Sequence, residues 1–430
     1  MRIVAASLVR NAFGPRTSPL SAQDVVRIAL WPIAIMSIIH RSYVLTSNGY
    51  ITDDWAPVYL ALRHFRASEP VYTDVFTEVD PHYLYPPGGT LLMAPFGYFD
   101  SIYAARNWFI LLNTLAIIAA CYLLVRLFKF SMRSPALPAL LAAAFVTESV
   151  TNTLIFTNIN GCILLCEVLF FRWLLDGRHS REWLAGIAIG LSLTVKPVLA
   201  VLLLMPLLNR QWRALFAAAA VPLAFNAVAW PLVVDRGNFI HRTLPYILST
   251  RDYFNSSVLG NGIYYGLPMW LIVVLRLLFV ALAVGSLWLL YRYYHRRDPL
   301  FWMLTSSGVL LITSWLVLSL AQGYYSMMLF PFLMTVVLPN SVLRNWPAWL
   351  ATYGFLTLDR WLMWRWPTTG RFLEYMKITY GWSLMLIVVF CVLYYRYLDA
   401  KADGRLAADP DAGIDPAWMT PRRVPASVGS

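Results

Sequence analysis

The chain has 430 residues, of which 59% are hydrophobic and only 13% are charged, against roughly 25% charged in an ordinary soluble domain. This composition excludes a soluble globular protein. Lys and Arg number 34 against 22 Asp and Glu, but a mean hydropathy of +0.59 leaves no polar face for binding nucleic acid. The net charge of +12 therefore indicates membrane topology, in which basic residues gather in cytoplasmic loops.

Apolar segments long enough to cross a bilayer fill most of the sequence. A helix needs about 20 residues to cross about 30 Å of hydrocarbon at about 1.5 Å per residue. We therefore predict an all-α polytopic membrane protein with about ten spans, a cytoplasmic N-terminus at 1–24 and a transmembrane domain at 25–398. The predicted spans, in chain order, are residues 25–46, 105–129, 135–152, 155–175, 213–235, 267–291, 299–320, 325–341, 346–364 and 378–398.

The apolar stretch 183–208 is predicted to enter the membrane and return to the same side. Arginines flank both of its ends, at Arg181 and Arg210, and arginines in short loops favour the cytoplasm. The stretch breaks at Lys196 and Pro197, because proline lacks the helical N–H and clashes with the preceding turn. A re-entrant helix pair fits these features better than a single crossing.

Two long loops and a polar tail complete the predicted organisation. The loop 47–105 is acidic, is assigned to the extracytoplasmic side, and is long enough to hold short helices on the membrane surface. The loop 236–266 is also assigned to the extracytoplasmic side by the count of membrane crossings, but it is basic. The segment 399–430 has too little apolar surface to fold and is predicted to be a disordered cytoplasmic tail.

Two adjacent acids, Asp53 and Asp54, follow the first predicted span in the sequence NGYITDDWAPVY. A carboxylate at the outer membrane surface, beside apolar Trp55, is suited to act as a general base toward the head group of a lipid-linked substrate. The structural alternative is a helix N-cap, which Asp commonly provides. Two acids allow both roles.

Lys196 is the second candidate, because a lysine within an apolar stretch costs about 2.5 to 3.5 kcal/mol on insertion scales and is functional by default. An anionic phosphate would compensate its charge. The alternative is that the side chain extends to the membrane interface.

The basic loop departs from the positive-inside pattern. His241, Arg242 and Arg251 lie in this extracytoplasmic segment, so a lipid-linked phosphate is predicted to offset their charge, since guanidinium groups match phosphate oxygens. Membrane lipid head groups are the alternative partner.

Recognition of a neutral sugar needs hydroxyl, amide and aromatic groups, which the outer ends of the predicted spans supply. The alternative for the aromatic residues is an interfacial belt. The predicted substrate-binding residues are Tyr85, Asn158, Asn160, Asn255, Ser257, Asn261, Gln322, Tyr324 and Tyr325.

The sequence has no P-loop, dinucleotide fingerprint or zinc-ligand cluster, so a glycosyl donor would have to be lipid-linked. The acidic first outer loop, the many spans and the Lys-Pro break resemble the GT-C type membrane glycosyltransferases that use polyprenyl-phosphate sugars. The strings ITDDWAPVY, VDPHYLYPPGGTLLMAPFGY, NTLIFTNINGCILL and SLAQGYYSMMLFPFLMTVVLPNS resemble the mycobacterial α-(1→3) arabinofuranosyltransferases. Related mannosyltransferases tend to have histidines where this chain has Gln322–Tyr325.

The resemblance implies transfer of arabinofuranose from decaprenyl-phosphoryl-β-D-arabinofuranose to a 3-hydroxyl of α-(1→5) arabinan, which makes the branches of arabinogalactan and lipoarabinomannan. A β donor and an α product require inversion, and Asp54 matches the acid of the family, with Asp53 as the second choice. No metal and no cofactor are predicted. The active site is expected on the extracytoplasmic side of the plasma (inner) membrane.

Two other functions remain open from the sequence. One is a polyprenol-phosphate-mannose-dependent mannosyltransferase, which belongs to the same broader family. The other is a transporter or flippase for a lipid-linked sugar, which would share the spans and the buried lysine. The absence of an inverted repeat and the position of the acids in a long loop argue against a transporter.

Overall fold

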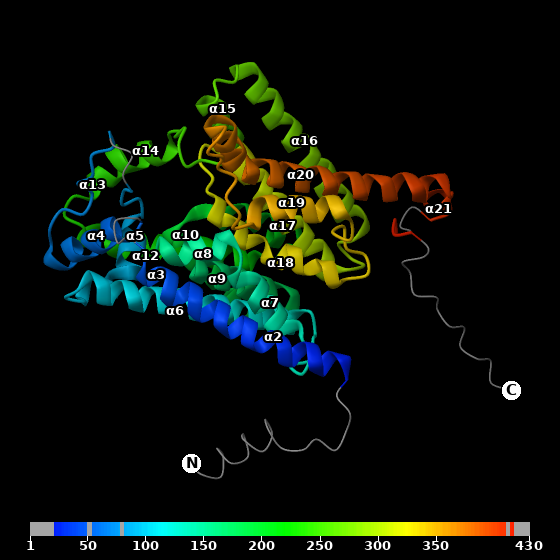
Figure 1. The fold of residues 1–430 in the computed structure, drawn as a ribbon, viewed down its shortest axis with the longest axis horizontal. Coiled ribbons are helices and arrows are strands. Elements are labelled where there is room, and N and C mark those ends of the chain that lie inside the picture. Colours follow the sequence, from blue (N-terminus) through cyan, green and yellow to red (C-terminus); the bar gives the residue numbers. More distant parts are fainter. Residues whose placement is uncertain (1–20, 50–53, 78–80, 410–412, 417–430) are drawn as a thin grey trace, which may run out of the picture.

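In the computed structural model, the described residues are 21–49, 54–77, 81–409 and 413–416, and none of them forms a β-strand. The described part of the first half of the chain forms a series of long helices and short helical segments (Figure 1). They are α2 (Ala22–Ile39), the π-helical turn η1 (His40–Val44), α3 (Leu45–Ser47), α4 (Trp55–Ala67), α5 (Pro87–Met93), η2 (Ala94–Tyr98), α6 (Ile102–Leu127), α7 (Ala136–Phe145), α8 (Glu148–Ile155), α9 (Asn160–Asp176), α10 (His179–Val195), η3 (Pro197–Leu203) and α11 (Leu204–Leu208).

The second half contains three long apolar helices, α16, α17 and α20. Its elements are α12 (Trp212–Ala229), η4 (Trp230–Leu232), α13 (Arg236–Asn238), the π-helical turn η5 (Phe239–Thr243), α14 (Leu244–Leu248), α15 (Val258–Tyr264), α16 (Met269–Tyr293), α17 (Pro299–Val317), η6 (Gly323–Leu329), α18 (Phe330–Leu333), η7 (Met334–Val337), α19 (Trp346–Leu356), α20 (Pro367–Ala402) and α21 (Arg405–Ala408).

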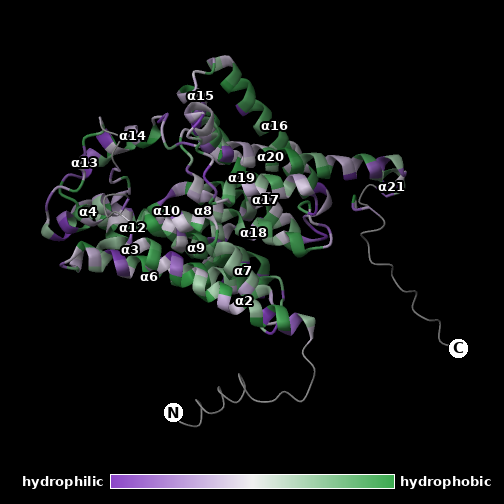
Figure 2. Ribbon diagram, viewed as in Figure 1, coloured by the Kyte–Doolittle hydropathy of each residue, from purple (hydrophilic) through white to green (hydrophobic). Residues whose placement is uncertain are grey.

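In the part of the chain that the structure describes, six helical segments are long and apolar enough to cross a membrane, and the pair α7 and α8, bent by 62°, is a seventh if it counts as one span. The six are Ala22–Ser47, Ile102–Leu127, Trp212–Leu232, Met269–Tyr293, Pro299–Val317 and Pro367–Ala402. Helix α16 is hydrophobic over most of its length, whereas hydrophilic residues gather in the connections around α13 (Figure 2). The predicted all-helical, multi-pass character is confirmed for the described residues.

Three of the ten predicted spans correspond to shorter helices. The stretch 155–175 overlaps the 17-residue α9. The stretch 325–341 overlaps short 3₁₀ and α segments between Gly323 and Val337, and 346–364 contains the 11-residue α19. A hydropathy pattern counts apolar residues whether or not they are helical. A proline in the first turn of α18 separates that short helix from η6. Helix length in the described residues therefore gives fewer candidate spans than the hydropathy of the sequence predicted.

The two long loops meet at one end of the bundle, which we call the loop end. The Asp235 carboxylate accepts hydrogen bonds from the main-chain N–H groups of Val71 and Tyr72, at 2.8 and 2.6 Å. The rings of Phe76 and Tyr246 stack with centroids 4.3 Å apart. Helices α4, α5, α13 and α14 gather here, far from α21 (Figure 1). Loops 47–105 and 236–266 therefore lie at the same end, as the charge pattern requires.

The stretch 183–208 begins and ends at the opposite end of the bundle. Gln211 donates to the main-chain oxygen of Leu174 at 3.1 Å, and Asn209 contacts the His295 ring at 2.6 Å. Between these ends, α10 stops at Val195 and the chain is extended at Lys196, with φ −139° and ψ 124°, before η3. The helix break is therefore at the predicted position, and Glu182 and Arg210, near the two ends of the stretch, line one cavity. Entry into the membrane and return to the same side stay a prediction.

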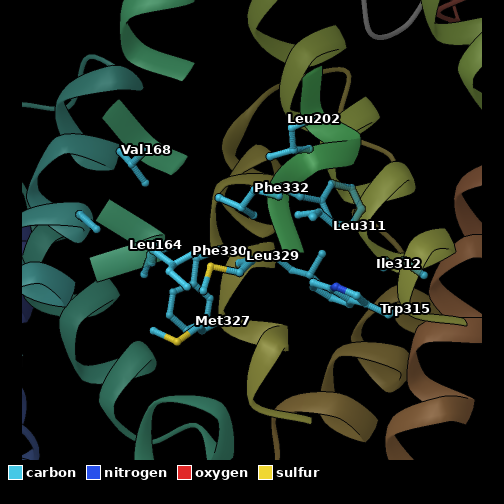
Figure 3. Close-up of a cluster of buried hydrophobic side chains, with 14 of the residues drawn as sticks. Leu164, Val168, Leu202, Leu311, Ile312, Trp315, Met327, Leu329, Phe330 and Phe332 are labelled. Carbon is cyan, nitrogen blue, oxygen red and sulfur yellow. The ribbon is translucent and has the colours of Figure 1, made fainter. Parts of the chain in front are cut away.

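The core joins α9 to α17 and to the η6–α18 segment (Figure 3). Leu164 on α9 lies beside Phe330 and Met327, and all three side chains are buried. A Cβ atom on Gly308 would lie 2.4 Å from the Phe332 ring, so the glycine allows this close helix contact. This packing fixes the segment that follows Gln322 against α9.

Part of the segment predicted to be disordered packs against the bundle. Ile414 is fully buried, and the Asp415 carboxylate contacts the Arg396 guanidinium at 3.1 Å and the Tyr294 hydroxyl at 2.5 Å. Arg396 is only 2% exposed, and a buried guanidinium requires an anionic partner. Residues 399–402 continue α20, and 405–408 form α21. The prediction of disorder for 399–430 is therefore corrected for the described residues 399–409 and 413–416, because composition does not reveal such pairings.

Candidate active site

Asp54 occupies the N-cap position of α4, but its side chain does not cap the helix. Its Oδ2 atom instead accepts a hydrogen bond from the Asn158 amide at 2.5 Å and lies 3.5 Å from the Tyr324 hydroxyl. The neighbouring Trp55 is 1% exposed, donates to the main-chain oxygen of Ile102 at 3.2 Å, and so anchors the start of α4. The capping alternative is therefore not observed for Asp54. Asp53 lies outside the described residues.

Asn158 lies in the turn between α8 and α9. Thr157 adopts a left-handed conformation with φ 57°, which turns the chain so that the Asn158 N–H bonds to the Thr153 oxygen at 2.8 Å. The Asn158 side chain is 3% exposed, and its Oδ1 atom accepts a hydrogen bond from the Lys196 ammonium at 2.7 Å. One amide group therefore contacts both the carboxylate and the ammonium.

The Lys196 ammonium is surrounded by three tyrosine rings. Its nitrogen lies 5.7 Å from the centroid of Tyr85, 5.6 Å from that of Tyr324 and 5.8 Å from that of Tyr325. Aromatic faces attract a cation at these distances. The break in the helix at Pro197 thus delivers the lysine into an aromatic enclosure beside Asp54.

The turn sequence YPPGG holds Tyr85 against this break. The Gly88 N–H donates to the Asn226 side chain at 2.9 Å, and a Cβ atom on Gly89 would lie 3.1 Å from the Thr194 oxygen. Glycine therefore lets α5 approach the residues just before Lys196. Burial raises the pKa of the Tyr85 phenol well above its usual value, and the Asp54 charge adds to this effect, so Tyr85 stays neutral.

The predicted phosphate-binding residues of the basic loop have different surroundings. Arg251 lies over the rings of Tyr246 and Tyr253, at 5.6 and 5.8 Å. Arg242 donates to the main-chain oxygen of Asp74 at 2.9 Å. His241 is exposed on the turn η5.

Several predicted sugar-binding residues make hydrogen bonds within the protein. The Asn255 amide donates to the main-chain oxygens of Arg251 and Ser319, at 2.7 and 2.8 Å, and so holds the basic loop beside the segment leading to Tyr324. The Ser257 hydroxyl caps α15, and the Asn261 amide donates to Thr379 at 2.7 Å.

Two others make no such bonds with the residues that the structure describes. Asn160 is fully buried, and both polar atoms of its side chain lack a hydrogen-bond partner in the described part of the chain. Gln322 directly precedes η6, and its side chain does not cap that helix. Asn160 is the first residue of α9 and lies two residues after Asn158, whose amide contacts Asp54 and Lys196.

The sequence did not single out Asn226, which bonds to Gly88 and positions the YPPGG turn. The available signal was a lone amide in the otherwise apolar span 213–235, because such residues usually face a polar partner. Among the residues that the structure describes, no three His, Cys, Asp or Glu side chains form a group that would hold a metal ion.

The fold and the site define a multi-pass helical membrane protein that holds a carboxylate, an ammonium and three tyrosines together at one end of the bundle. The model of glycosyltransferase family 87 matches residues 83–319, which is more than half of the chain. The chain belongs to this family of glycosyltransferases, and the resemblance identified from the sequence is confirmed.

Close relatives cover almost the whole chain. An alpha-(1->3)-arabinofuranosyltransferase of Mycolicibacterium smegmatis is 68% identical over 97% of this chain and 96% of its own length. The protein of the same name from Mycobacterium tuberculosis is 66% identical over 98% and 96%, and that from Corynebacterium glutamicum is 44% identical over 87% and 89%. No solved structure matches significantly.

Proposed function

We propose that the chain transfers an arabinofuranosyl residue from decaprenyl-phosphoryl-β-D-arabinofuranose to the 3-hydroxyl of an α-(1→5) arabinan, which creates branches in arabinogalactan and lipoarabinomannan. The observation that carries the proposal is the contact of the Asn158 amide with both the Asp54 carboxylate, at 2.5 Å, and the Lys196 ammonium, at 2.7 Å. The names of the relatives support the sugar and the linkage. The lipid donor and the arabinan acceptor follow from the resemblance of the sequence strings.

Inversion at the anomeric carbon requires a single displacement. Asp54 removes the proton of the acceptor hydroxyl. The oxygen of that hydroxyl attacks C1 of the donor while the bond from C1 to the phosphate oxygen breaks. The electron pair of that bond stays with the phosphate, whose increased negative charge the Lys196 ammonium stabilises. The products are the glycosidic bond, a protonated Asp54 and decaprenyl phosphate.

Asn158 is proposed as a positioning residue in this reaction. Because its amide nitrogen donates to Asp54 and its oxygen accepts from Lys196, it sets the distance between the base and the group that binds the leaving phosphate. The rings of Tyr85, Tyr324 and Tyr325 then bound the space beside the ammonium and offer faces to the sugar.

The remaining predicted residues are proposed to act around this centre. Arg251 supplements Lys196 at the phosphate, with Arg242 and His241 farther along the basic loop. Asn160 and Gln322 contact sugar hydroxyls. Three further residues, Asn255, Ser257 and Asn261, shape the sugar site through the segments that they hold. Asp53 is the second choice for the base.

The proposed topology places this site on the extracytoplasmic side of the plasma membrane. Loops 47–105 and 236–266 meet at the loop end, near Asp54, while basic residues such as Arg210 and Arg296 lie together at the opposite end. The positive-inside rule then assigns the opposite end to the cytoplasm. Ten spans, a re-entrant 183–208 pair, and α4 and α5 on the membrane surface complete the proposal.

The test is reconstitution of purified protein with synthetic decaprenyl-phosphoryl arabinofuranose and a short α-(1→5) arabinan, followed by linkage analysis of the product. The expected product carries a new α-(1→3) arabinofuranosyl branch. Transfer of mannose from a polyprenyl-phosphate donor, with none of arabinose, would overturn the proposal. Movement of the labelled donor across proteoliposomes without any new glycosidic bond would do the same and would support a transporter.

A further inference from the structure

A cavity of about 430 Å³ lies along one face of α4, beside the candidate active site. One wall comes from α4 itself, with Ala56, Pro57 and Leu60 near its start and His64 near its end. The facing wall comes from described residues between α4 and α5, including Thr73 and Asp74. A volume in this range suits a small organic ligand or one to two sugar units.

The cavity adjoins the Asp54 site through two structural connections. Asp54 is the N-cap residue of α4, and Ala56 and Pro57 stand in the first turn of that helix, so the cavity begins within about one helical pitch, about 5.4 Å, of Asp54 along the axis. At the facing wall, the Tyr83 ring lies 5.6 Å from the ring of Tyr85, which borders the Lys196 ammonium.

The facing wall is held in a fixed position. The Asp74 carboxylate accepts a hydrogen bond from the Tyr83 N–H at 2.6 Å, and its main-chain oxygen accepts one from Arg242 at 2.9 Å. The Asp235 carboxylate accepts from the N–H groups of Val71 and Tyr72. Both outer loops therefore shape the cavity before any ligand binds, which lowers the cost of binding.

The chemistry of the lining favours a neutral sugar over a phosphate. No Lys or Arg occurs among the described residues that line the cavity, so it offers no cation to a phosphate group. Thr73, Asp74 and His64 provide hydrogen-bonding groups for hydroxyls. Leu60, which is 53% exposed, and Pro57 provide an apolar surface for the C–H face of a ring.

We propose that this cavity binds the acceptor oligosaccharide, with a furanose unit next to the reacting one seated along α4, so that the chain is led to Asp54. This inference rests on the proposed function, because it assigns the acceptor of that reaction to a second, cation-free site. The donor phosphate stays with Lys196, and the two substrates reach Asp54 from different groups of residues.

The first experiment measures kinetics of Leu60→Trp, in which the larger ring fills the cavity, and of Val75→Trp as a matched control. Val75 is 60% exposed in the same loop and does not line the cavity. For Leu60→Trp we expect the KM for a short arabinan to rise about tenfold, equivalent to about 1.4 kcal/mol of binding. Its kcat should change less, and its affinity for decaprenyl phosphate should match wild type. An unchanged acceptor KM in a folded Leu60→Trp protein would overturn the inference.

The second experiment does not depend on activity. Thr73→Cys and Val75→Cys, each in a background lacking the exposed Cys391, are labelled with a maleimide in the presence of arabinan oligosaccharide or of decaprenyl phosphate. Arabinan should slow labelling at position 73 but not at position 75. Protection by decaprenyl phosphate instead, equal protection at both positions, or no protection would overturn the inference. Wild-type protein that forms no arabinosyl product, while arabinan still protects position 73, would reject the proposed reaction but not the sugar site.

Discussion

The ammonium of Lys196 and the carboxylate of Asp54 contact opposite ends of one side-chain amide, that of Asn158. The Asn158 oxygen lies 2.7 Å from the ammonium nitrogen, and its nitrogen lies 2.5 Å from a carboxylate oxygen. A direct ion pair would bring the two charges together and occupy both with each other. The intervening amide keeps each charge available for a substrate group while it fixes their separation.

Asp54→Asn is expected to abolish transfer, with a loss of about 10² to 10⁴-fold in rate, because the amide cannot accept the proton of the acceptor hydroxyl. Decaprenyl phosphate binding should be close to wild type. Steady-state kinetics and equilibrium binding check both statements. Asp53→Asn should retain more activity; a dead Asp53→Asn beside an active Asp54→Asn would reverse the assignment.

Lys196→Ala is expected to weaken decaprenyl phosphate binding by about tenfold or more, because a hydrogen bond to a charged group contributes about 1.5 to 3 kcal/mol. Binding of an arabinan acceptor should not change. Lys196→Arg should restore binding only in part, since a planar guanidinium does not fit every site built for an ammonium. Equal losses of donor and acceptor binding would show that Lys196 serves packing at the helix break instead.

Asn158→Ala and Lys196→Ala should not have additive effects on transfer. Residues that share a hydrogen-bonded network couple, by about 0.5 to 3 kcal/mol, in a double-mutant cycle. We expect Asn158→Ala to slow the wild-type enzyme more than it slows the Lys196→Ala protein, because the amide then has no ammonium to hold. Tyr98→Ala, at an exposed position on η2, should be additive with Lys196→Ala and serves as the control. Strict additivity for Asn158 would contradict its positioning role.

The sequence singled out most of the residues that meet at the candidate site but not their contacts, and their roles stay predictions. Intramembrane charge singled out Lys196, and the position after the first span singled out Asp54; the structure brings both to Asn158. Asn158 is 104 positions from Asp54 and 38 positions from Lys196 in the sequence, so no local sequence pattern includes these contacts. Tyr85 reaches the same site because Gly89 of YPPGG fits against the Thr194–Val195 backbone, a tertiary contact that only the fold reveals.

Helix existence was predictable where apolar runs were long, as for α6 and α16. Helices were less predictable where the chain forms short, interrupted segments, as between Gly323 and Val337. Apolar composition does not distinguish a continuous α-helix from 3₁₀ turns. The buried Arg396–Asp415 pair was not predicted, since its two residues are unremarkable members of a basic helix end and a polar tail.

Cysteine labels at position 75 and at position 252 should react with a membrane-impermeant maleimide added to intact cells, whereas a label at position 296 should not. The first two belong to the loops that meet at the loop end, and Arg296 is exposed beside the ends of 183–208 at the opposite end. The labels are placed in a Cys391→Ser background to remove the exposed thiol. Reaction of position 296 from outside would mean that the later loops are inverted and that 183–208 crosses the membrane once.

Glu167→Met is expected to raise the thermal stability of the purified protein. Glu167 lies on α9, is fully buried, and neither carboxyl oxygen has a hydrogen-bond partner in the described part of the chain. A buried polar group without a partner costs about 1 to 3 kcal/mol, and methionine has a similar length without that cost. Leu164→Ala, one turn earlier on the same helix, should have the opposite effect, since it leaves a cavity against Met327 and Phe330. Thermal unfolding in detergent, followed by tryptophan fluorescence, compares the midpoints. A lower midpoint for Glu167→Met, together with lost transfer, would show that the carboxyl has a partner in the working enzyme and belongs to its function.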